Sequence, residues 1–183
     1  MKVEYFIGIV PPKDYLCRIE KFQNKWMRQL GVEPHITLKA QGGLTSDEKW
    51  VAKVCNVCER VKPFQVSLDE PKYFGDNILY LSVISNGLIH LHQEVLQEIA
   101  PPKHLIKQYF EGDEYVPHLT LSTEYVSNDL KNGLSTIDLK EMEKLSNEIL
   151  SPFPSFEVDF IRVYKLNIQK KIYEKHFDIS LSS

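Results

Sequence analysis

The sequence lacks an apolar run of about 18 residues, the length that a membrane-spanning helix needs. Its N-terminal segment, MKVEYFIGIVPPKDYL, has one basic residue and a short apolar run before Pro11-Pro12. A secretory signal would have a longer apolar core and a cleavage site of small residues. We therefore expect no membrane association, and we predict a cytoplasmic protein whose first apolar segment is a strand.

Cysteine is scarce, with three residues in 183. An odd count without a secretory signal is typical of reduced thiols. Cys55-Asn-Val-Cys58 has the C-x-x-C spacing, but a zinc site would need a second pair of ligands, and none follows. The motif also lies inside a predicted helix, whereas a redox motif needs a strand-to-helix junction. We expect buried apolar cysteines, no metal and no cofactor.

An excess of basic residues is also missing: 22 Lys and Arg oppose 25 Asp and Glu, and the net charge is −3. This balance argues against an extended surface that coats nucleic acid. It leaves open a nucleotide or an RNA end as a partner, because the charge of a pocket can differ in sign from that of the whole chain. We expect a monomer.

One pentapeptide pattern occurs twice, as Pro34-His35-Ile36-Thr37-Leu38 and as Pro117-His118-Leu119-Thr120-Leu121. The composition, with six His and five Thr, predicts about 0.16 His-x-Thr units by chance. Both copies also share the preceding proline and the following leucine. A single copy would be read as a half-buried strand with a hydrogen-bonded histidine, but the repetition favours a functional pair.

Strand alternation gives the repeat a geometry, because successive side chains point to opposite faces. His35, Thr37 and Lys39 are predicted on one face, with Ile36 and Leu38 on the other. In the second copy, His118, Thr120 and Ser122 share the polar face. If two lobes face each other, two histidines and two threonines converge on one cleft.

This set of side chains fits a phosphodiester reaction. One imidazole can remove a proton from the attacking hydroxyl while the other protonates the departing oxygen, since an unperturbed histidine has a pKa of about 6.5. The Thr37 and Thr120 hydroxyls can donate to the phosphoryl oxygens, and Lys39 can add positive charge. Clustered carboxylates, which usually hold metal for phosphoryl transfer, have no obvious constellation here.

The predicted order of elements is β-α-β-α-β, twice. This indicates an α+β fold, bilobal, with two pseudo-symmetric β-α-β-α-β lobes. We expect a single bilobal domain over 1–183, with lobe 1 at about 1–75, lobe 2 at about 76–183, and last strands able to cross between lobes. The expected strands are 5–10, 35–39, 64–68, 72–75, 78–84, 118–122, 156–167 and 173–181. The expected helices are 13–30, 45–62, 88–100 and 138–150, the second opened by a capping box of Thr45 and Glu48.

Segments outside the motifs carry weaker expectations. Insertions in the second half are predicted around 103–114 and 128–136, and 101–115 is read as a mobile loop near the second motif. Aromatic residues in turns offer stacking surfaces to a base. His90 and His92 are read as surface or cap positions, His176 is read as a solvent-facing strand position, and the basic residues from 162 to 171 are read as a solvated charge run. The aromatic candidates are Tyr73, Phe74, Tyr109, Phe110 and Tyr115, of which Tyr73 and Tyr115 are taken, with Lys39 and Ser122, as substrate-binding.

Paired H-x-T motifs, one in each half of a chain of this length, resemble the two-histidine (2H) phosphoesterase superfamily. The segments EPHITLK and EYVPHLTLS are most similar to its bacterial 2'-5' RNA ligase-like branch. The resemblance covers essentially the whole chain and implies antiparallel sheets that line a central cleft. It also implies cleavage or transfer at 2',5'-linked or 2',3'-cyclic phosphodiesters, with His35, Thr37, His118 and Thr120 as the catalytic set. It does not assign the acid, the base or the natural substrate.

Two other classes of function remain open from the sequence. A non-catalytic module could bind a nucleotide or an RNA end through the same cleft, and it would differ from an enzyme only in turnover. A protein-interaction scaffold would have neither phosphate binding nor a polar cleft.

Overall fold

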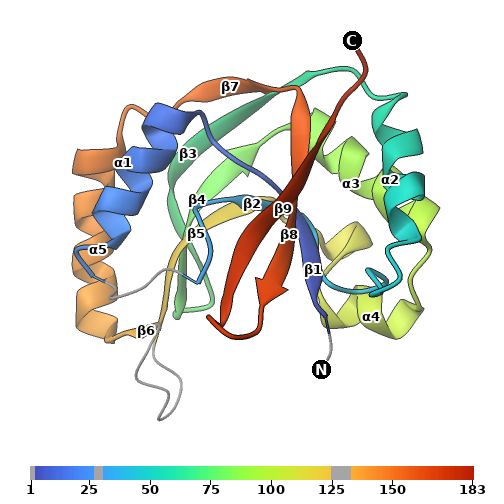
Figure 1. The fold of residues 1–183 in the computed structure, drawn as a ribbon. Coiled ribbons are helices and arrows are strands. Elements are labelled where there is room, and N and C mark those ends of the chain that lie inside the picture. The colour runs from blue at the N-terminus through green and yellow to red at the C-terminus, as the bar shows by residue number, and fades with distance from the viewer. Residues whose placement is uncertain (1–2, 27–30, 125–132) are drawn as a thin grey trace.

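Two successive passes of β-α-β-α-β run along the chain, as the sequence predicts. The computed structural model describes residues 3–26, 31–124 and 133–183, and Figure 1 shows their arrangement. The elements up to the opening strand of the second pass are β1 (Tyr5–Ile9), α1 (Lys13–Gln23), β2 (Ile36–Lys39), α2 (Trp50–Cys58), β3 (Phe64–Phe74) and β4 (Ile78–Ile84). The remaining elements are α3 (Asn86–Ile99), α4 (Lys103–Gln108), the 3-10 helix η1 (Gly112–Glu114), β5 (His118–Glu124), β6 (Gly133–Leu134), α5 (Thr136–Leu150), β7 (Ser155–Val158), β8 (Phe160–Asn167) and β9 (Ile172–Ser180).

The strands join in one curved sheet with the order β7-β3-β4-β5-β2-β1-β8-β9, and β6 pairs with β5 at the side. Among the described strands, all pairings are antiparallel except that of β6. The α+β class with antiparallel pairing is therefore confirmed. The final strands β8 and β9 return to lie beside β1, whereas β3 pairs with β4.

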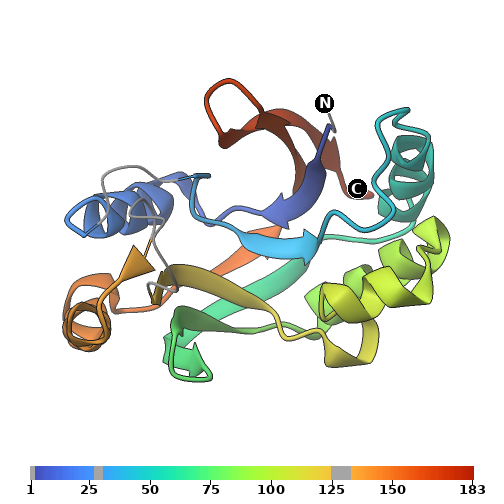
Figure 2. The ribbon, with the colours of Figure 1, turned by 90° about the horizontal axis from the view of Figure 1, so that it is seen from below.

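The helices cover the sheet in two groups. Helices α1 and α5 pack together on one side, and α2, α3 and α4 lie on the other (Figure 1 and Figure 2). Between them, Ile36, Leu38, Leu119 and Leu121 have no exposed surface, as alternation in the motif strands predicts. Within the described ranges, no helix has both the length and the apolar character to cross a bilayer.

Several boundaries differ from the sequence predictions. Helix α1 ends at Gln23 rather than at residue 30, and residues 27–30 lie outside the described part of the chain. Strand β3 continues through the two strands predicted at 64–68 and 72–75. The predicted mobile loop at 101–115 contains α4 and η1. The second predicted insertion lies largely outside the described residues.

The capping box predicted for the second helix is wrong. Helix α2 begins at Trp50, and the Thr45 hydroxyl donates to Asp47 at 2.6 Å. Glu48 has a φ of 54°, and its carboxylate accepts from Tyr5 at 2.6 Å, so a tertiary contact overrides the local pattern. Cys55 and Cys58 do lie inside α2, Cys58 fully buried, and burial raises the pKa of both thiols.

Candidate active site

The two motif strands are neighbours at the centre of the sheet. Ile36 of β2 lies opposite Leu119 of β5 in the antiparallel pair. One step along this register sets His35 across from Thr120 and Thr37 across from His118, on the face opposite the buried apolar residues. The two histidines are then diagonal neighbours, a relation that places residues about 7–8 Å apart. The register thus brings the four predicted side chains to one face of one sheet.

Both histidines make the same local hydrogen bond. The Nδ1 atom of His35 lies 2.8 Å from the carbonyl oxygen of Glu33, and that of His118 lies 2.7 Å from the carbonyl oxygen of Val116. A carbonyl oxygen only accepts, so each Nδ1 carries the proton. Each neutral ring then has an unprotonated Nε2. Between the carbonyl and each histidine stands a proline, whose ring fixes φ and holds this short loop in shape.

His35 packs against two stacked rings. Phe6 of β1 and Tyr164 of β8 stack with their centroids 4.5 Å apart, and the His35 ring lies 4.7 Å from Phe6. A methyl group at Gly8 would meet the His35 ring at 3.4 Å and Tyr164 at 3.2 Å. Glycine at this position therefore allows the imidazole to lie close to the sheet.

His118 has an equivalent pair of rings. Phe74 of β3 and Tyr80 of β4 stack with their centroids 4.1 Å apart, and His118 lies edge-on to Phe74 at 4.8 Å. The pseudo-two-fold relation between the halves thus extends from the motifs to their supports. In both halves, packed rings restrict the orientation of the imidazole.

Burial lowers the pKa of both histidines below the ordinary value. For His35 this effect is opposed by the hydrogen bond to the Glu33 carbonyl and by the Glu33 charge, while the charge of His118 lowers the pKa further. For His118 the bond to Val116 opposes the effect of burial. The mutual repulsion favours a state in which only one of the two imidazoles carries a positive charge.

A pocket of about 650 Å³ opens over this face of the sheet. Thr37, His118 and Thr120 line it, and Thr120 is exposed. Much of the remaining lining is a wall of aromatic and apolar side chains, in which Phe110 is 69% exposed despite its size. The wall comprises Phe74, Ile78, Tyr109, Phe110, Tyr115 and Val116. The volume is within the range of small-molecule sites.

Lys39 does not contribute a free positive charge to the pocket. Its side chain is fully buried, and Nζ donates to both carboxylate oxygens of Glu111 at 2.9 Å and to the carbonyl oxygens of Ala40 and Gly42. Burial lowers the pKa of Lys39, while the charge of Glu111 opposes this shift. The long side chain turns back to a residue 72 positions away in sequence, which alternation within β2 cannot predict.

Tyr115 and His92 hold in place the segment that carries Tyr109 and Phe110 of the wall. Tyr115 donates to the carbonyl oxygen of Thr37 at 2.7 Å, and its ring stacks on His92 with centroids 3.8 Å apart. His92 is fully buried, its Nδ1 lies 2.7 Å from the Leu38 carbonyl oxygen, and its Nε2 accepts from the backbone N–H of Gly112. The prediction of a surface or cap histidine at 92 is therefore wrong. His90 is exposed, as is His176, which contacts Glu48.

Two of the other predicted substrate-binding residues lie away from the pocket lining. Tyr73 points to α5 and donates to the carbonyl oxygen of Leu139 at 3.2 Å, whereas its neighbour Phe74 faces the pocket. Ser122 is buried, 3% exposed. The register between β4 and β5 shifts after Leu79, and this irregularity breaks the alternation that predicts Ser122 on the face of Thr120.

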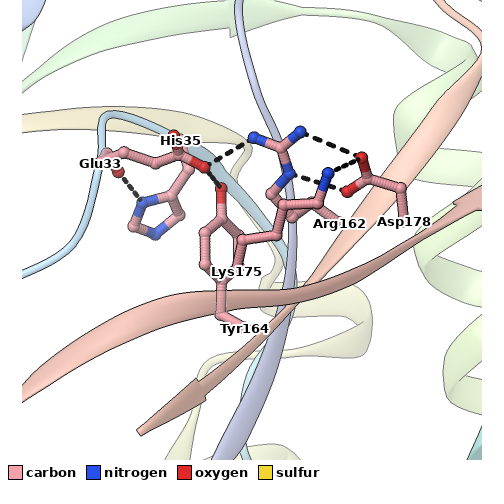
Figure 3. Close-up of polar contacts among 6 residues, drawn as sticks. All are labelled: Glu33, His35, Arg162, Tyr164, Lys175 and Asp178. Carbon is pink, nitrogen blue, oxygen red and sulfur yellow. Dashed lines mark hydrogen bonds and ion pairs between the residues drawn. The ribbon is translucent and has the colours of Figure 1, made fainter. Parts of the chain in front are cut away.

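A polar network beside His35 was not apparent from the sequence. Arg162 donates through Nη1 to Glu33 at 2.8 Å and through Nε and Nη2 to Asp178, and the Tyr164 hydroxyl donates to the same Glu33 oxygen at 2.8 Å (Figure 3). Lys175 also contacts Asp178, at 2.6 Å. The Arg162 side chain is only 15% exposed, so the solvated charge run predicted for 162–171 does not include it. Spacing alone could not reveal the network, because Glu33 is 129 residues from Arg162.

Within the three described ranges, no group of three His, Cys, Asp or Glu side chains is arranged to hold a metal ion.

An antiparallel α+β sheet with His-x-Thr motifs on its two adjacent central strands defines a class of protein. The family model for the 2'-5' RNA ligase superfamily matches residues 18–167, and the chain belongs to this family of 2H phosphoesterases. No curated protein matches the chain at a significant level.

Several solved structures share the fold. TT0787 of Thermus thermophilus is 15% identical with a TM-score of 0.63, and the alignment covers 97% of each chain. E. coli LigT complexed with NADP+ is 16% identical with a TM-score of 0.60, and the alignment covers 100% of this chain and 99% of LigT. LigT complexed with 3'-AMP is 15% identical with a TM-score of 0.59, and the alignment covers 100% of both chains.

Proposed function

We propose that this protein is a metal-independent phosphodiesterase that acts on 2',3'-cyclic or 2',5'-linked phosphodiesters, with His35 and His118 as its acid–base pair. The observation that carries the proposal is the matching Nδ1 hydrogen bond of the two rings, at 2.8 and 2.7 Å. It leaves the Nε2 atoms of both imidazoles for proton transfer, one as acceptor and one as donor.

The reaction needs two proton movements. The neutral imidazole accepts the proton of the attacking water or hydroxyl as the new P–O bond forms. The protonated imidazole donates its proton to the oxygen of the P–O bond that breaks, so no free alkoxide leaves. The two rings end the step with exchanged protonation states. Because the rings can supply both transfers, the chemistry requires no metal-bound water.

The threonines supply the remaining electrostatic part. Thr37 and Thr120 line the same pocket as His118, and their hydroxyls can donate to the non-bridging phosphoryl oxygens, where negative charge increases in the transition state. Tyr115 holds the backbone of Thr37 through its carbonyl oxygen. This contact keeps the donor in place before substrate arrives.

The pocket wall supports a nucleotide as the substrate class. Phe110 presents a largely exposed ring in the pocket that Phe74 also lines, and aromatic faces of this kind stack on bases without sequence preference. The exposed ring stands on a backbone with a φ of 52°, a conformation that a phenylalanine rarely adopts. The crystallised complexes of E. coli LigT with 3'-AMP and with NADP+ are consistent with nucleotide binding by this fold.

A substrate panel tests the proposal. The four 2',3'-cyclic nucleotides and a set of 2',5'-linked dinucleotides are incubated with the protein in EDTA and, separately, with added divalent metal. We expect cleavage of at least one member, equal with and without EDTA, and loss of about 10²-fold or more in His35→Ala and His118→Ala. His90→Ala, on the exposed face of α3, is the matched control and keeps full activity.

The competing function is a module that binds nucleotides without turning them over. Saturable binding of the panel without cleavage of any member would favour that function and contradict the proposed enzyme. Activity that survives both histidine substitutions would place the chemistry elsewhere. Activity that disappears in EDTA would contradict its metal independence.

A further inference from the structure

Glu33 occupies a special position relative to the first histidine. Its backbone carbonyl accepts the Nδ1–H of His35 at 2.8 Å, while its side-chain oxygen Oε1 accepts from Arg162 and Tyr164, each at 2.8 Å. The residue is thus held at both ends, with the imidazole on one side and strand β8 on the other (Figure 3). The side chain of Glu33 therefore restrains the carbonyl that sets the orientation of His35.

The second motif differs in this respect. The corresponding carbonyl belongs to Val116, whose side chain is 48% exposed and carries no charge. The two motifs, Glu-Pro-His and Val-Pro-His, therefore differ at the residue whose carbonyl accepts the hydrogen bond from the histidine. The two imidazoles are held in similar ways. Only the carbonyl bound to His35 comes from a residue whose own side chain, a carboxylate, is held by other residues.

We propose that Glu33, anchored by Arg162 and Tyr164, is a positioning residue that orients His35 and makes the two histidines electrostatically inequivalent. This inference rests on the proposed function. The inference adds to the proposed function a reason why one histidine always acts as the acid and the other always acts as the base.

The charges around Glu33 decide how strongly its carboxylate acts on the ring. Arg162 offsets part of its charge, and Arg162 is in turn shared with Asp178, which also contacts Lys175. From helix α1, Glu20 is close enough for the Glu33 charge to contribute to its raised pKa, after burial. The Glu33 charge raises the pKa of His35 against the effects of burial and of His118. The groups that face this pair are Arg162 and Tyr164 from β8, Lys175 and Asp178 from β9, Glu20 from α1 and His118 from β5.

Arg162 is held by carboxylates through all three of its guanidinium nitrogens. Its Nε, Nη1 and Nη2 atoms all donate to Asp178 or Glu33. The hydrogen bonds to Asp178, and then those to Glu33, raise its pKa above the usual range, so it keeps its charge in any assay. Its role is to hold the carboxylate of Glu33.

Two substitutions with opposite electrostatic consequences test the inference. Glu33→Gln removes the negative charge and keeps the size and the hydrogen bond from Tyr164, so the pKa of His35 falls. Arg162→Gln removes the cation that offsets Glu33, so the pKa of His35 rises. Both are measured by NMR titration of the labelled histidine rings, a readout that does not depend on turnover. The pKa of His118 stays nearly constant in Glu33→Gln.

The kinetic result has a matching signature. In Glu33→Gln we expect kcat to fall about three- to tenfold, as for a small displacement of a catalytic group, with KM nearly unchanged. One limb of the pH–rate profile moves to lower pH and the other stays. If the acidic limb moves, His35 is the base, and if the alkaline limb moves, it is the acid. Glu174→Gln on β9, which removes a carboxylate paired with Lys170, is the control and changes neither limb.

The two failures are distinguishable. Absence of cleavage across the whole substrate panel overturns the proposed function but leaves the NMR titration readable. A His35 pKa that is the same in wild type and Glu33→Gln, or that moves in the same direction in both variants, overturns the role of Glu33. If Arg162→Gln does not fold, Glu33→Gln alone still decides.

Discussion

The hydroxyl of Tyr115 donates a 2.7 Å hydrogen bond to the backbone carbonyl of Thr37, 78 residues earlier in the chain. One element of the second half therefore holds the phosphate-binding candidate of the first. The same segment carries Phe110 and Glu111. Positioning of the motif strand and shaping of the pocket wall are thus coupled through one short stretch of chain.

Replacement of either motif threonine by valine should slow the reaction without disturbing the fold. Thr37→Val and Thr120→Val keep the side-chain shape and remove the hydroxyl donor. Loss of one such donor to a developing oxyanion lowers kcat by about 10²–10³-fold. Steady-state kinetics on a cleaved 2',3'-cyclic nucleotide measure this effect. Thr45→Val is the control: it removes a hydroxyl that donates to Asp47 near α2, and it should retain wild-type rates. Equal rates in all three variants would contradict the assignment of Thr37 and Thr120 as phosphate-binding residues.

The pH dependence of kcat/KM should be bell-shaped with its maximum below about 6.5, the ordinary pKa of histidine. Burial lowers the pKa of both His35 and His118, so the singly protonated pair exists at lower pH than for free imidazoles. Because the two rings interact, the limbs of the wild-type profile do not by themselves assign a pKa to one ring; the limb that moves in Glu33→Gln makes that assignment. A maximum above about pH 8 would be incompatible with two buried imidazoles as acid and base.

Removal of the Phe110 ring should weaken the binding of nucleotides selectively. Stacking on one aromatic side chain contributes about 1–3 kcal/mol, so KM should rise about 5- to 150-fold in Phe110→Ala. The free energy of unfolding should change little because the ring is 69% exposed. A substrate without a base, ribose 2',3'-cyclic phosphate, should be cleaved equally by both proteins. Ile137→Ala, 79% exposed on α5, controls for loss of a surface apolar group.

Breaking the Lys39–Glu111 pair should destabilise the protein strongly. Lys39→Met leaves a buried carboxylate without its partner, and loss of one member of a buried pair costs about 3–5 kcal/mol. Urea denaturation of Lys39→Met measures the loss in the free energy of unfolding. The double variant Lys39→Met/Glu111→Leu, which removes both charges, should recover part of this loss. Lys170→Met removes the exposed contact with Glu174 and should cost under about 1 kcal/mol. Equal effects of the buried and exposed variants would refute the role of the pair.

Stability should fall as the pH drops below about 6.5, the ordinary pKa of histidine. Burial lowers the pKa of His35, His92 and His118 in the folded state, so the unfolded chain binds protons first as the pH falls through the ordinary histidine range. The free energy of unfolding is therefore greatest above that range. His92→Gln should make the pH slope shallower while lowering stability at pH 7, because the Leu38 carbonyl and the Gly112 N–H lose a well-placed partner. An unchanged slope would indicate that His92 does not contribute.

Strand alternation was sufficient to predict which side chains of each motif share a face, because that arrangement is local, whereas the catalytic roles of the four side chains stay a prediction. A strand has a period of two, so His35 and Thr37 share a face whatever the rest of the chain does, and the apolar residues between them define the opposite face. The β-α-β-α-β order was predictable for a similar reason, since helix and strand periodicities differ within a few residues. The repeated order predicted two motif strands facing each other across a cleft, but not that β2 and β5 pair as neighbours in one sheet, because that pairing depends on contacts between distant parts of the chain.

The surroundings of the motifs depend on distant partners and were not predictable. Lys39 is on the predicted strand, but its flexible stem reaches Glu111 in a segment with weak periodicity. His92 is buried among apolar residues yet makes polar contacts, a combination that its neighbours in sequence do not indicate. Ser122 lies beyond an irregularity between β4 and β5 that only the register of the partner strand determines.

The seam between β2 and β5 has the geometry of an isologous interface, in which the same patch meets itself across a two-fold axis. Each half of the chain brings one imidazole and one hydroxyl, and each stacked Phe–Tyr pair takes its phenylalanine from the first half and its tyrosine from the second. In the proposed mechanism, a half chain would lack one of the two imidazoles that the reaction needs. The exchange of the last two strands into the first half keeps the halves from separating, and so keeps the pair of imidazoles together.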